Sequence, residues 1–204
     1  MKYVFESDNM KDYLLRTDIV NYDSENIIEL YRMLKKETVS NLDYIRKVYE
    51  FIRDDIKHSN DIGSSLVTCS ASEVLLEKTG ICFAKSNLLA ALLRINEIPC
   101  GFCYQLLRLD EDTSPLILHG LNAVYIEEYD KWIRLDARGN REGIDAQFDT
   151  TQERLAFDVR KELGEIDYPY VYINPDKSVV EALQSNSSFE ELWDNLPQKL
   201  TYVI

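Results

Sequence analysis

The chain has 204 residues, of which 45% are hydrophobic and 29% are charged, and these values suit one folded domain with a sizeable core. Its formal net charge of −13 disfavours nucleic acid and anionic membrane surfaces as partners, because like charges repel. No stretch approaches the roughly 18 consecutive apolar residues of a membrane span, and the N-terminus lacks the pattern of a secretion signal. We therefore expect a cytoplasmic protein whose four cysteines are reduced thiols.

The distribution of apolar residues predicts a single domain over residues 1–204. Its core should cover about residues 41–140, preceded by a partly helical N-terminal extension over 1–40 and followed by a C-terminal extension over 141–204. No internal repeat and no low-complexity segment interrupts the chain.

The first half of the chain has helical periodicity. A turn-forming segment at 21–24 precedes an apolar stripe that predicts one helix within the N-terminal extension. From Asn41, a favourable N-cap, apolar residues recur at steps of three and four and predict a second helix that reaches about Lys57. A polar segment over 58–65 ends this helix.

A short helix and a longer apolar one follow. Ser70 and Glu73 match a capping box, and Gly80 is placed to close the short helix that they begin. Residues 82–93 are apolar nearly throughout and end before Ile98-Pro99. This pattern predicts a buried central helix.

The second half of the chain changes to a strand pattern. Strands are predicted over 100–109, 119–126 and 131–136, with a hairpin loop over 127–130. An extended segment over 168–175 could be a strand or a covering loop, and two short helices, the second capped by Ser188, should end the chain. Helices followed by antiparallel strands indicate an α+β fold.

Cys82 lies where a glycine-containing loop enters the predicted central helix. The first turn of a helix presents unpaired N–H groups and the positive end of the helix dipole, and both favour a thiolate over a thiol. The sequence therefore predicts a reactive cysteine at this position.

A histidine and an aspartate follow on successive predicted strands. His119 is one of two histidines in the chain, and Asp136 ends the next strand. A thiol attacks an amide carbonyl as its thiolate, a histidine removes and returns the proton, and an aspartate orients the imidazole and stabilises its cation. Cys82, His119 and Asp136 are therefore candidates for nucleophile, base and orienting residue.

The hairpin register restricts this interpretation. If Ile126 pairs with Lys131, Asp136 lies opposite Leu121, which shares a sheet face with His119. A register shifted by one residue would place the histidine and the aspartate on opposite faces. The triad therefore requires a four-residue loop or a β-bulge.

These residues resemble the bacterial transglutaminase-like proteins, in particular a branch of cysteine proteases with a papain-like arrangement of Cys, His and Asp. The resemblance covers about residues 41–140, and its segments are 79–85, 92–102, 119–123 and 132–138, with a less specific match at 164–169. It implies a transglutaminase-like or papain-like core in which the central helix carries Cys82 at its N-terminus and packs on an antiparallel sheet carrying His119 and Asp136. It also implies that these three residues are nucleophile, base and orienting residue.

Proteins of this family hydrolyse amides, transfer acyl groups or have no activity. We expect a thiol-dependent acyl-transfer enzyme that acts on amide bonds of a peptide, protein or small amide, and we favour hydrolysis, as a peptidase or amidase, over transfer to an amine. The alternatives are a catalytically inactive binding module with the same fold and an arylamine-type acyltransferase. The sequence does not indicate the oligomeric state.

The donors that would stabilise an oxyanion are less well defined. Backbone N–H groups at the start of the Cys82 helix are the first candidates. No Gln or Trp precedes Cys82. The chain therefore has no counterpart of the side chain that donates a hydrogen bond to the oxyanion in papain or in transglutaminases. Residues that could instead bind the oxyanion or line the substrate site are His58, Asn60, Tyr104 and Gln105.

The other cysteines are expected to be buried thiols. Cys100 and Cys103 form a C-x-x-C pair, but this pair enters a strand, where alternation should point the two thiols to opposite faces. A zinc site could be built only from all four cysteines, including Cys69 and Cys82. These last two are too far apart in the chain to form the second closely spaced pair of a zinc motif. We expect neither a metal nor a cofactor.

Overall fold

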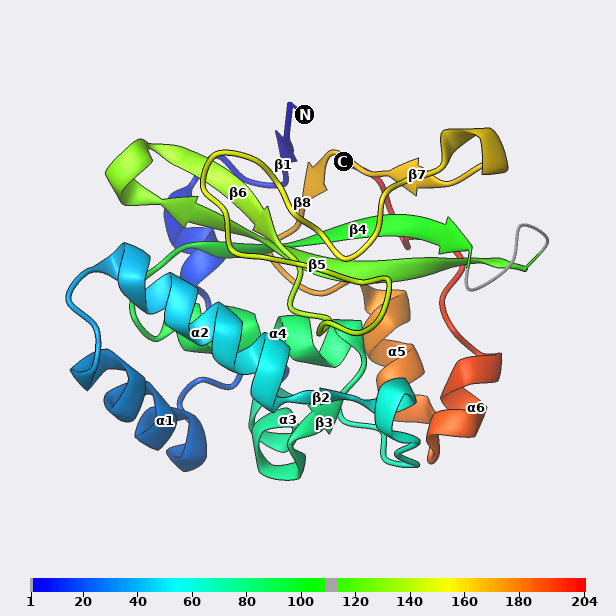
Figure 1. Cartoon of the computed structure of the whole chain (residues 1–204), viewed down its shortest axis with the longest axis horizontal. Helices are drawn as coiled ribbons and strands as arrows, with labels where there is room; N and C mark the ends of the chain where they lie inside the picture. The colour runs from blue at the N-terminus through cyan, green and yellow to red at the C-terminus, as the bar shows by residue number, and fades with distance from the viewer. Residues whose placement is uncertain (1, 109–113) are drawn as a thin grey trace.

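The structure, a computed structural model, describes residues 2–108 and 114–204. A four-stranded antiparallel sheet in the order β6-β5-β4-β7 has helices on one side and the N-terminal strand on the other (Figure 1). This arrangement confirms the predicted α+β class. The helices are α1 (Glu25–Lys36), α2 (Asn41–Asp55), α3 (Ala71–Glu77), α4 (Cys82–Arg94), α5 (Lys177–Ser185) and α6 (Phe189–Asp194).

The main sheet is built from the three predicted strands and one short strand from the C-terminal part. Its members are β4 (Cys100–Arg108), β5 (Leu116–Ile126), β6 (Lys131–Leu135) and β7 (Ile166–Asp167). Ile126 pairs with Lys131 across the hairpin, as the four-residue loop requires. Leu109, which was predicted to end the first strand, lies outside the described residues.

Two small parallel pairs complete the strand structure. β1 (Val4–Phe5) pairs with β8 (Tyr170–Val171), so the extended C-terminal segment is in part a strand. β2 (Lys57–His58) pairs with β3 (Thr79–Gly80), which places His58 opposite the glycine two residues before Cys82. A short parallel pair thus brings the end of α2 to the start of α4.

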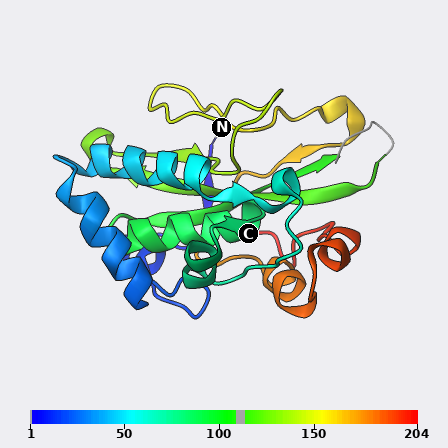
Figure 2. The same ribbon diagram turned by 60° about the horizontal axis from the view of Figure 1, so that its bottom comes forward.

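α4 is the central helix of the core. Every residue from Phe83 to Arg94 is buried, and the helix packs against α2, α3 and β5. Figures 1 and 2 show α4 lying between α2 and α3. A helix that is apolar on nearly all sides is stable only in such a position, because no side of it can face water without exposing apolar surface.

α4 and the sheet approach each other closely at Gly120. A Cβ atom at this position would lie 2.6 Å from Cδ1 of Phe83, the residue after Cys82. The missing side chain therefore lets β5 approach the first turn of α4. This approach sets the distance between the helix that carries Cys82 and the strand that carries His119.

Two helix boundaries differ from the prediction. Ser40, not Asn41, caps α2, and its hydroxyl accepts the N–H three residues on, because serine is as good an N-cap as asparagine. Gly80 does not close α3, since Lys78 takes the left-handed conformation there with φ 55°. Gly80 instead lies in β3, where a Cβ atom would be 2.9 Å from Oγ1 of Thr68.

The residues predicted as extensions contribute to the hydrophobic core. Tyr13 packs on the sheet face away from α4 together with Cys103, Leu121 and Val171. On the other face, α5 and α6 contribute apolar residues to the same large cluster as α2 and α4.

Within the described residues, no helix is long and apolar enough to cross a lipid bilayer.

Replacing Gly120 by alanine should lower the free energy of unfolding by about 1–3 kcal/mol, because the added methyl would overlap the Phe83 ring. Urea denaturation measures this change. Val39→Ala, at a position 96% exposed, is the control and should stay within about 0.5 kcal/mol of wild type. A Gly120→Ala protein as stable as wild type would show that the contact between α4 and β5 is not tight.

Candidate active site

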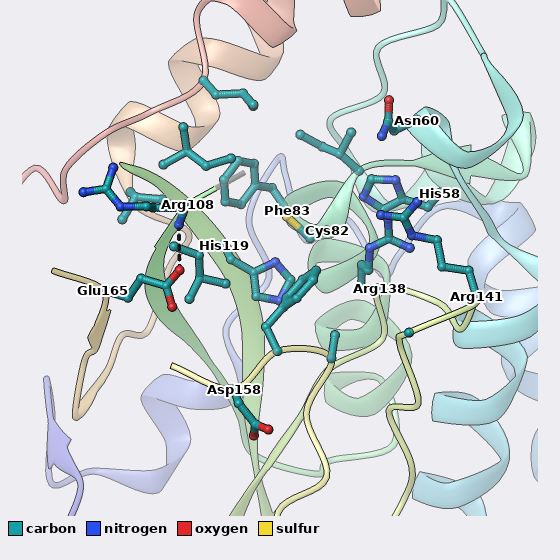
Figure 3. A pocket seen from close by; sticks show the side chains of 18 of the residues that line it. His58, Asn60, Cys82, Phe83, Arg108, His119, Arg138, Arg141, Asp158 and Glu165 are labelled. Atoms are coloured by element: carbon teal, nitrogen blue, oxygen red, sulfur yellow. Dashed lines mark hydrogen bonds between the residues drawn. The ribbon is translucent and has the colours of Figure 1, made fainter. Parts of the chain in front are cut away.

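Cys82 and His119 line a cavity of about 320 Å³ at the start of α4. Figure 3 shows their side chains next to each other, with His58 and Arg138 on one side and Arg108 and Glu165 on the other. Apolar side chains form much of the remaining wall, among them Ile81, Phe83, Leu118, Phe157, Trp193 and Leu196. A concave, partly apolar site with a few polar groups is typical of small-ligand binding.

Cys82 is the first residue of α4 and is half-buried. Ile81 precedes it as the N-cap and offers no side-chain acceptor to the helix. The N–H groups of the first turn have no carbonyl one turn earlier to bind. They form a positive helix end beside the thiol, as the sequence predicts.

His119 and Asp136 form a buried pair. Nε2 of His119 lies 2.8 Å from Oδ2 of Asp136, and both side chains are almost fully removed from solvent. The same Oδ2 accepts the N–H of Ala156, and Oδ1 accepts the N–H of Arg138, both at 3.1 Å. With Nε2 engaged, Nδ1 is the ring nitrogen that remains for Cys82.

Electrostatics favour the charged form of both members of the pair. Burial by itself lowers the pKa of His119, but Asp136 and Cys82, through charge and hydrogen bonding, outweigh it and raise this pKa to about 10. Burial by itself raises the pKa of Asp136, yet the charge of His119 and the hydrogen bonds from His119, Ala156 and Arg138 lower it. The pair is therefore an imidazolium and a carboxylate at neutral pH.

An aromatic ring covers the imidazole. Phe157 meets His119 edge to face with 5.0 Å between the ring centroids, and it follows Ala156, whose N–H holds Asp136. The loop after β6 thus fixes both members of the pair. A ring in this place excludes water and leaves the imidazole few other orientations.

Lys85 lies one turn after Cys82 and is fully buried. Its Nζ donates to the carbonyls of Ile56 at 2.5 Å, Arg138 at 2.9 Å and Arg53 at 3.4 Å. Burial, and next the charge of Arg138, lower the pKa of Lys85 to about 7. The lysine joins the helix of Cys82 to the end of α2 and to the segment that follows Asp136.

Two of the four further candidates from the sequence line the cavity. His58 and Asn60 do so, whereas Tyr104 and Gln105 do not. The hydroxyl of Tyr104 accepts the N–H of Asp176 at 2.7 Å, and Nε2 of Gln105 lies 3.4 Å from Oδ1 of Asp167. These two side chains are buried away from the cavity and hold the C-terminal segments against the sheet.

His58 is neutral. Burial, and next the charge of Arg138, lower the pKa of its imidazole to about 3. Its Nδ1 is buried and makes no hydrogen bond within residues 2–108 and 114–204. His58 therefore adds a polar but uncharged group to the cavity wall.

The other three cysteines are buried free thiols. Cys100 and Cys103 belong to different hydrophobic clusters, on opposite sides of the sheet, as strand alternation predicts. Burial raises the pKa of Cys69 and Cys100 to about 12 and raises that of Cys103 as well. In the part of the chain that the structure describes, no three His, Cys, Asp or Glu side chains are grouped to hold a metal ion.

Sequence reasoning assigned no role to Lys85, Arg138 or Phe157. A lysine inside a helix predicted to be fully buried could have been recognised, because a buried cation must find acceptors. Phe157 carries no such signal, since only the folded loop brings it to His119.

Comparisons with known proteins give one family match and several similar solved structures. Residues 30–137, more than half of the chain, match the family described as the Transglutaminase-like superfamily, and no curated protein matches the chain in sequence. One similar solved structure is described as "a Putative Cysteine Protease from Cytophaga hutchinsonii", with 21% identity and a TM-score of 0.49, over 65% of this chain and 43% of that one. Another, described as "a TGase", has 15% identity and a TM-score of 0.47, over 91% of this chain and 53% of that one.

The chain thus spans about half the length of these two structures. The family match extends from the second turn of α1 to the residue after Asp136 and includes α4, β4, β5 and β6. The chain belongs to the transglutaminase-like superfamily.

Proposed function

We propose that this protein is a thiol-dependent acyl-transfer enzyme that acts on amide bonds, with Cys82 as nucleophile, His119 as general acid and base, and Asp136 as the residue that orients the imidazole. The observation that carries the proposal is that His119 and the half-buried Cys82 line one cavity, and that His119 makes a 2.8 Å contact with the buried Asp136 behind it.

Acylation would begin with the Cys82 thiolate attacking the substrate carbonyl. The imidazolium of His119 would stabilise the thiolate and then give its proton to the leaving amine, so that the C–N bond breaks and a thioester forms on Cys82. Asp136, held by two backbone N–H groups, would keep the ring oriented during both steps.

The negative charge that develops on the carbonyl oxygen needs hydrogen-bond donors. The free N–H groups of the first turn of α4 are suitably placed, because they belong to Cys82 and its neighbours. The side-chain amide of Asn60 and the imidazole of His58 line the same cavity and are candidates for a further donor.

The thioester could pass to water or to an amine. In hydrolysis, neutral His119 would take a proton from water, which attacks the thioester, and the imidazolium would return a proton to the departing sulfur. We favour hydrolysis because water needs no second binding site. Arylamine-type acyl transfer and a binding module without turnover are the alternatives that the experiments below separate.

Activated amides and thioesters should give a rapid burst of leaving group close to one equivalent per chain, because the acyl group accumulates on Cys82. Stopped-flow absorbance measures the burst. Cys82→Ala should abolish it and lower turnover by about 10⁴-fold or more.

Cys69→Ala removes a buried thiol outside the cavity and should leave the burst intact. Capture of the acyl group by added amines at the expense of hydrolysis would instead identify a transferase. If no substrate in a broad panel acylates Cys82, the protein is a binding module and the enzymatic proposal is wrong.

Neither histidine should titrate between about pH 5 and 8, because the pKa of His119 is raised to about 10 and that of His58 is lowered to about 3, from an ordinary value of 6.5. NMR of the imidazole nitrogens reports both residues. In Asp136→Asn only Cys82 still opposes the effect of burial, so the pKa of His119 should fall below its wild-type value. Asp145→Asn, at an exposed site, should leave both resonances unchanged, and a wild-type His119 that titrates near pH 6.5 would contradict the ion pair.

Brief treatment with iodoacetamide near pH 6 should label Cys82 first, because the other three thiols are buried and their pKa values are raised. Peptide mass spectrometry locates the label. His119→Ala should lose most of the label at this pH, since the thiolate then has no imidazolium partner. Faster labelling of Cys69, Cys100 or Cys103 would argue against an activated Cys82.

A further inference from the structure

The cavity is rich in arginine although the chain carries a net charge of −13. Four arginines line it, against two acidic side chains, Asp158 and Glu165. Figure 3 shows Arg108 at one end of the cavity and Arg138 and Arg141 at the other. Arg160 belongs to the end of Arg108, because it binds Glu165 there.

The hydrogen-bond donors of the two arginines at the first end are engaged within the protein. Glu165 accepts hydrogen bonds from the guanidinium of Arg160 at 2.6 and 3.1 Å and from the backbone N–H of Arg108. The guanidinium of Arg108 donates to the carbonyls of Leu163 and Ser114. This end is therefore used to hold the loop around β7.

The second end has more positive than negative charge. Asp61 accepts two hydrogen bonds from Arg138, at 2.6 and 2.8 Å. Asp61 is also the ion-pair partner of Arg141. In this pair, Nε of Arg141 lies 3.7 Å from Oδ1 of Asp61, which is beyond hydrogen-bond distance. One carboxylate thus faces two guanidinium groups.

Arg141 keeps donors available to a ligand. Its side chain is 50% exposed, against 5% for Arg138, and in Figure 3 it reaches back over the cavity toward His58 and Arg138. His58 is neutral, in part because Arg138 and Lys85 disfavour a further positive charge beside them. The potential at this end is therefore positive without a contribution from the histidine.

We propose that the end of the cavity formed by Arg138 and Arg141 binds a carboxylate of the substrate, and that Arg141 selects amides that carry such a group near the reacting bond. A guanidinium offers two parallel N–H donors that match a carboxylate, and the partly desolvated cavity strengthens this contact. The inference rests on the proposed acyl-transfer function for the reacting bond, but the carboxylate site can be tested without turnover.

Two matched pairs of activated substrates test the selection. Succinyl-4-nitroanilide is compared with its succinamoyl analogue, which replaces the acyl-side carboxylate by a carbamoyl group. The acetyl thioester of 3-mercaptopropionate is compared with that of 3-mercaptopropionamide, which tests the leaving-group side. We expect kcat/KM to be about tenfold higher for the charged member of one pair, and that pair identifies the side on which the carboxylate binds.

Arg141→Gln should reduce this ratio to about one, since glutamine keeps a polar side chain without the charge. Arg154→Gln removes a comparably exposed arginine, paired with Asp145 outside the cavity, and should keep the ratio. A ratio of one in both wild-type pairs, or an unchanged ratio in Arg141→Gln, would overturn the proposal.

Equilibrium binding to Cys82→Ala separates this inference from the proposed function. Calorimetry with the same four compounds should show about tenfold tighter binding of one charged member, and the Cys82→Ala, Arg141→Gln double variant should lose the difference. If the wild type shows no turnover but this difference is present, the enzymatic proposal fails and the carboxylate site stands. Equal binding of charged and neutral compounds would refute the site.

Discussion

The contact between the first turn of α4 and the middle of β5 determines the geometry of the rest of the site. α4 is buried along nearly its whole length, so its position is set by packing on several sides at once, and the absence of a side chain at Gly120 lets the sheet approach Phe83. Because protein interiors are close-packed, a shift of either element would leave a void or an overlap. The cysteine at the helix start and the histidine next to the glycine are therefore held by the same contact.

Buried charges connect the other elements to this contact. Asp136 is surrounded by three N–H donors, and Lys85 donates to three carbonyls from two distant segments. An ion removed from water is tolerated only when such partners replace its hydration. The ends of α2 and β6 and the loop around Ala156 must consequently reach fixed positions before these charges are stable, which makes the site part of the folded core.

The charge of the whole chain and the charge of the cavity have opposite signs. The surface carries the acidic excess, whereas arginines collect around Cys82. Arg108 and Arg160 make the contacts that hold the loop around β7. Arg138 and Arg141 share a single carboxylate, that of Asp61. A negatively charged protein with a positive cavity can attract a small anion locally while it repels large polyanions.

The sequence by itself determined the fold class, the helices and strands of the core, and the candidate residues Cys82, His119 and Asp136. Periodicity, capping residues and a four-residue hairpin loop are local signals. The pairing of Ile126 with Lys131, which the sequence offered as a condition beside a β-bulge, is the one that the structure has. The tertiary structure alone decided which side chains surround the triad. It separated His58 and Asn60, which line the cavity, from Tyr104 and Gln105, which do not. It also brought Phe157 to His119 and Asp61 to Arg138 and Arg141. These contacts join residues that lie far apart in the chain, and no local pattern encodes them, because they arise only when the buried charges and the close-packed helix have fixed the paths of the connecting segments.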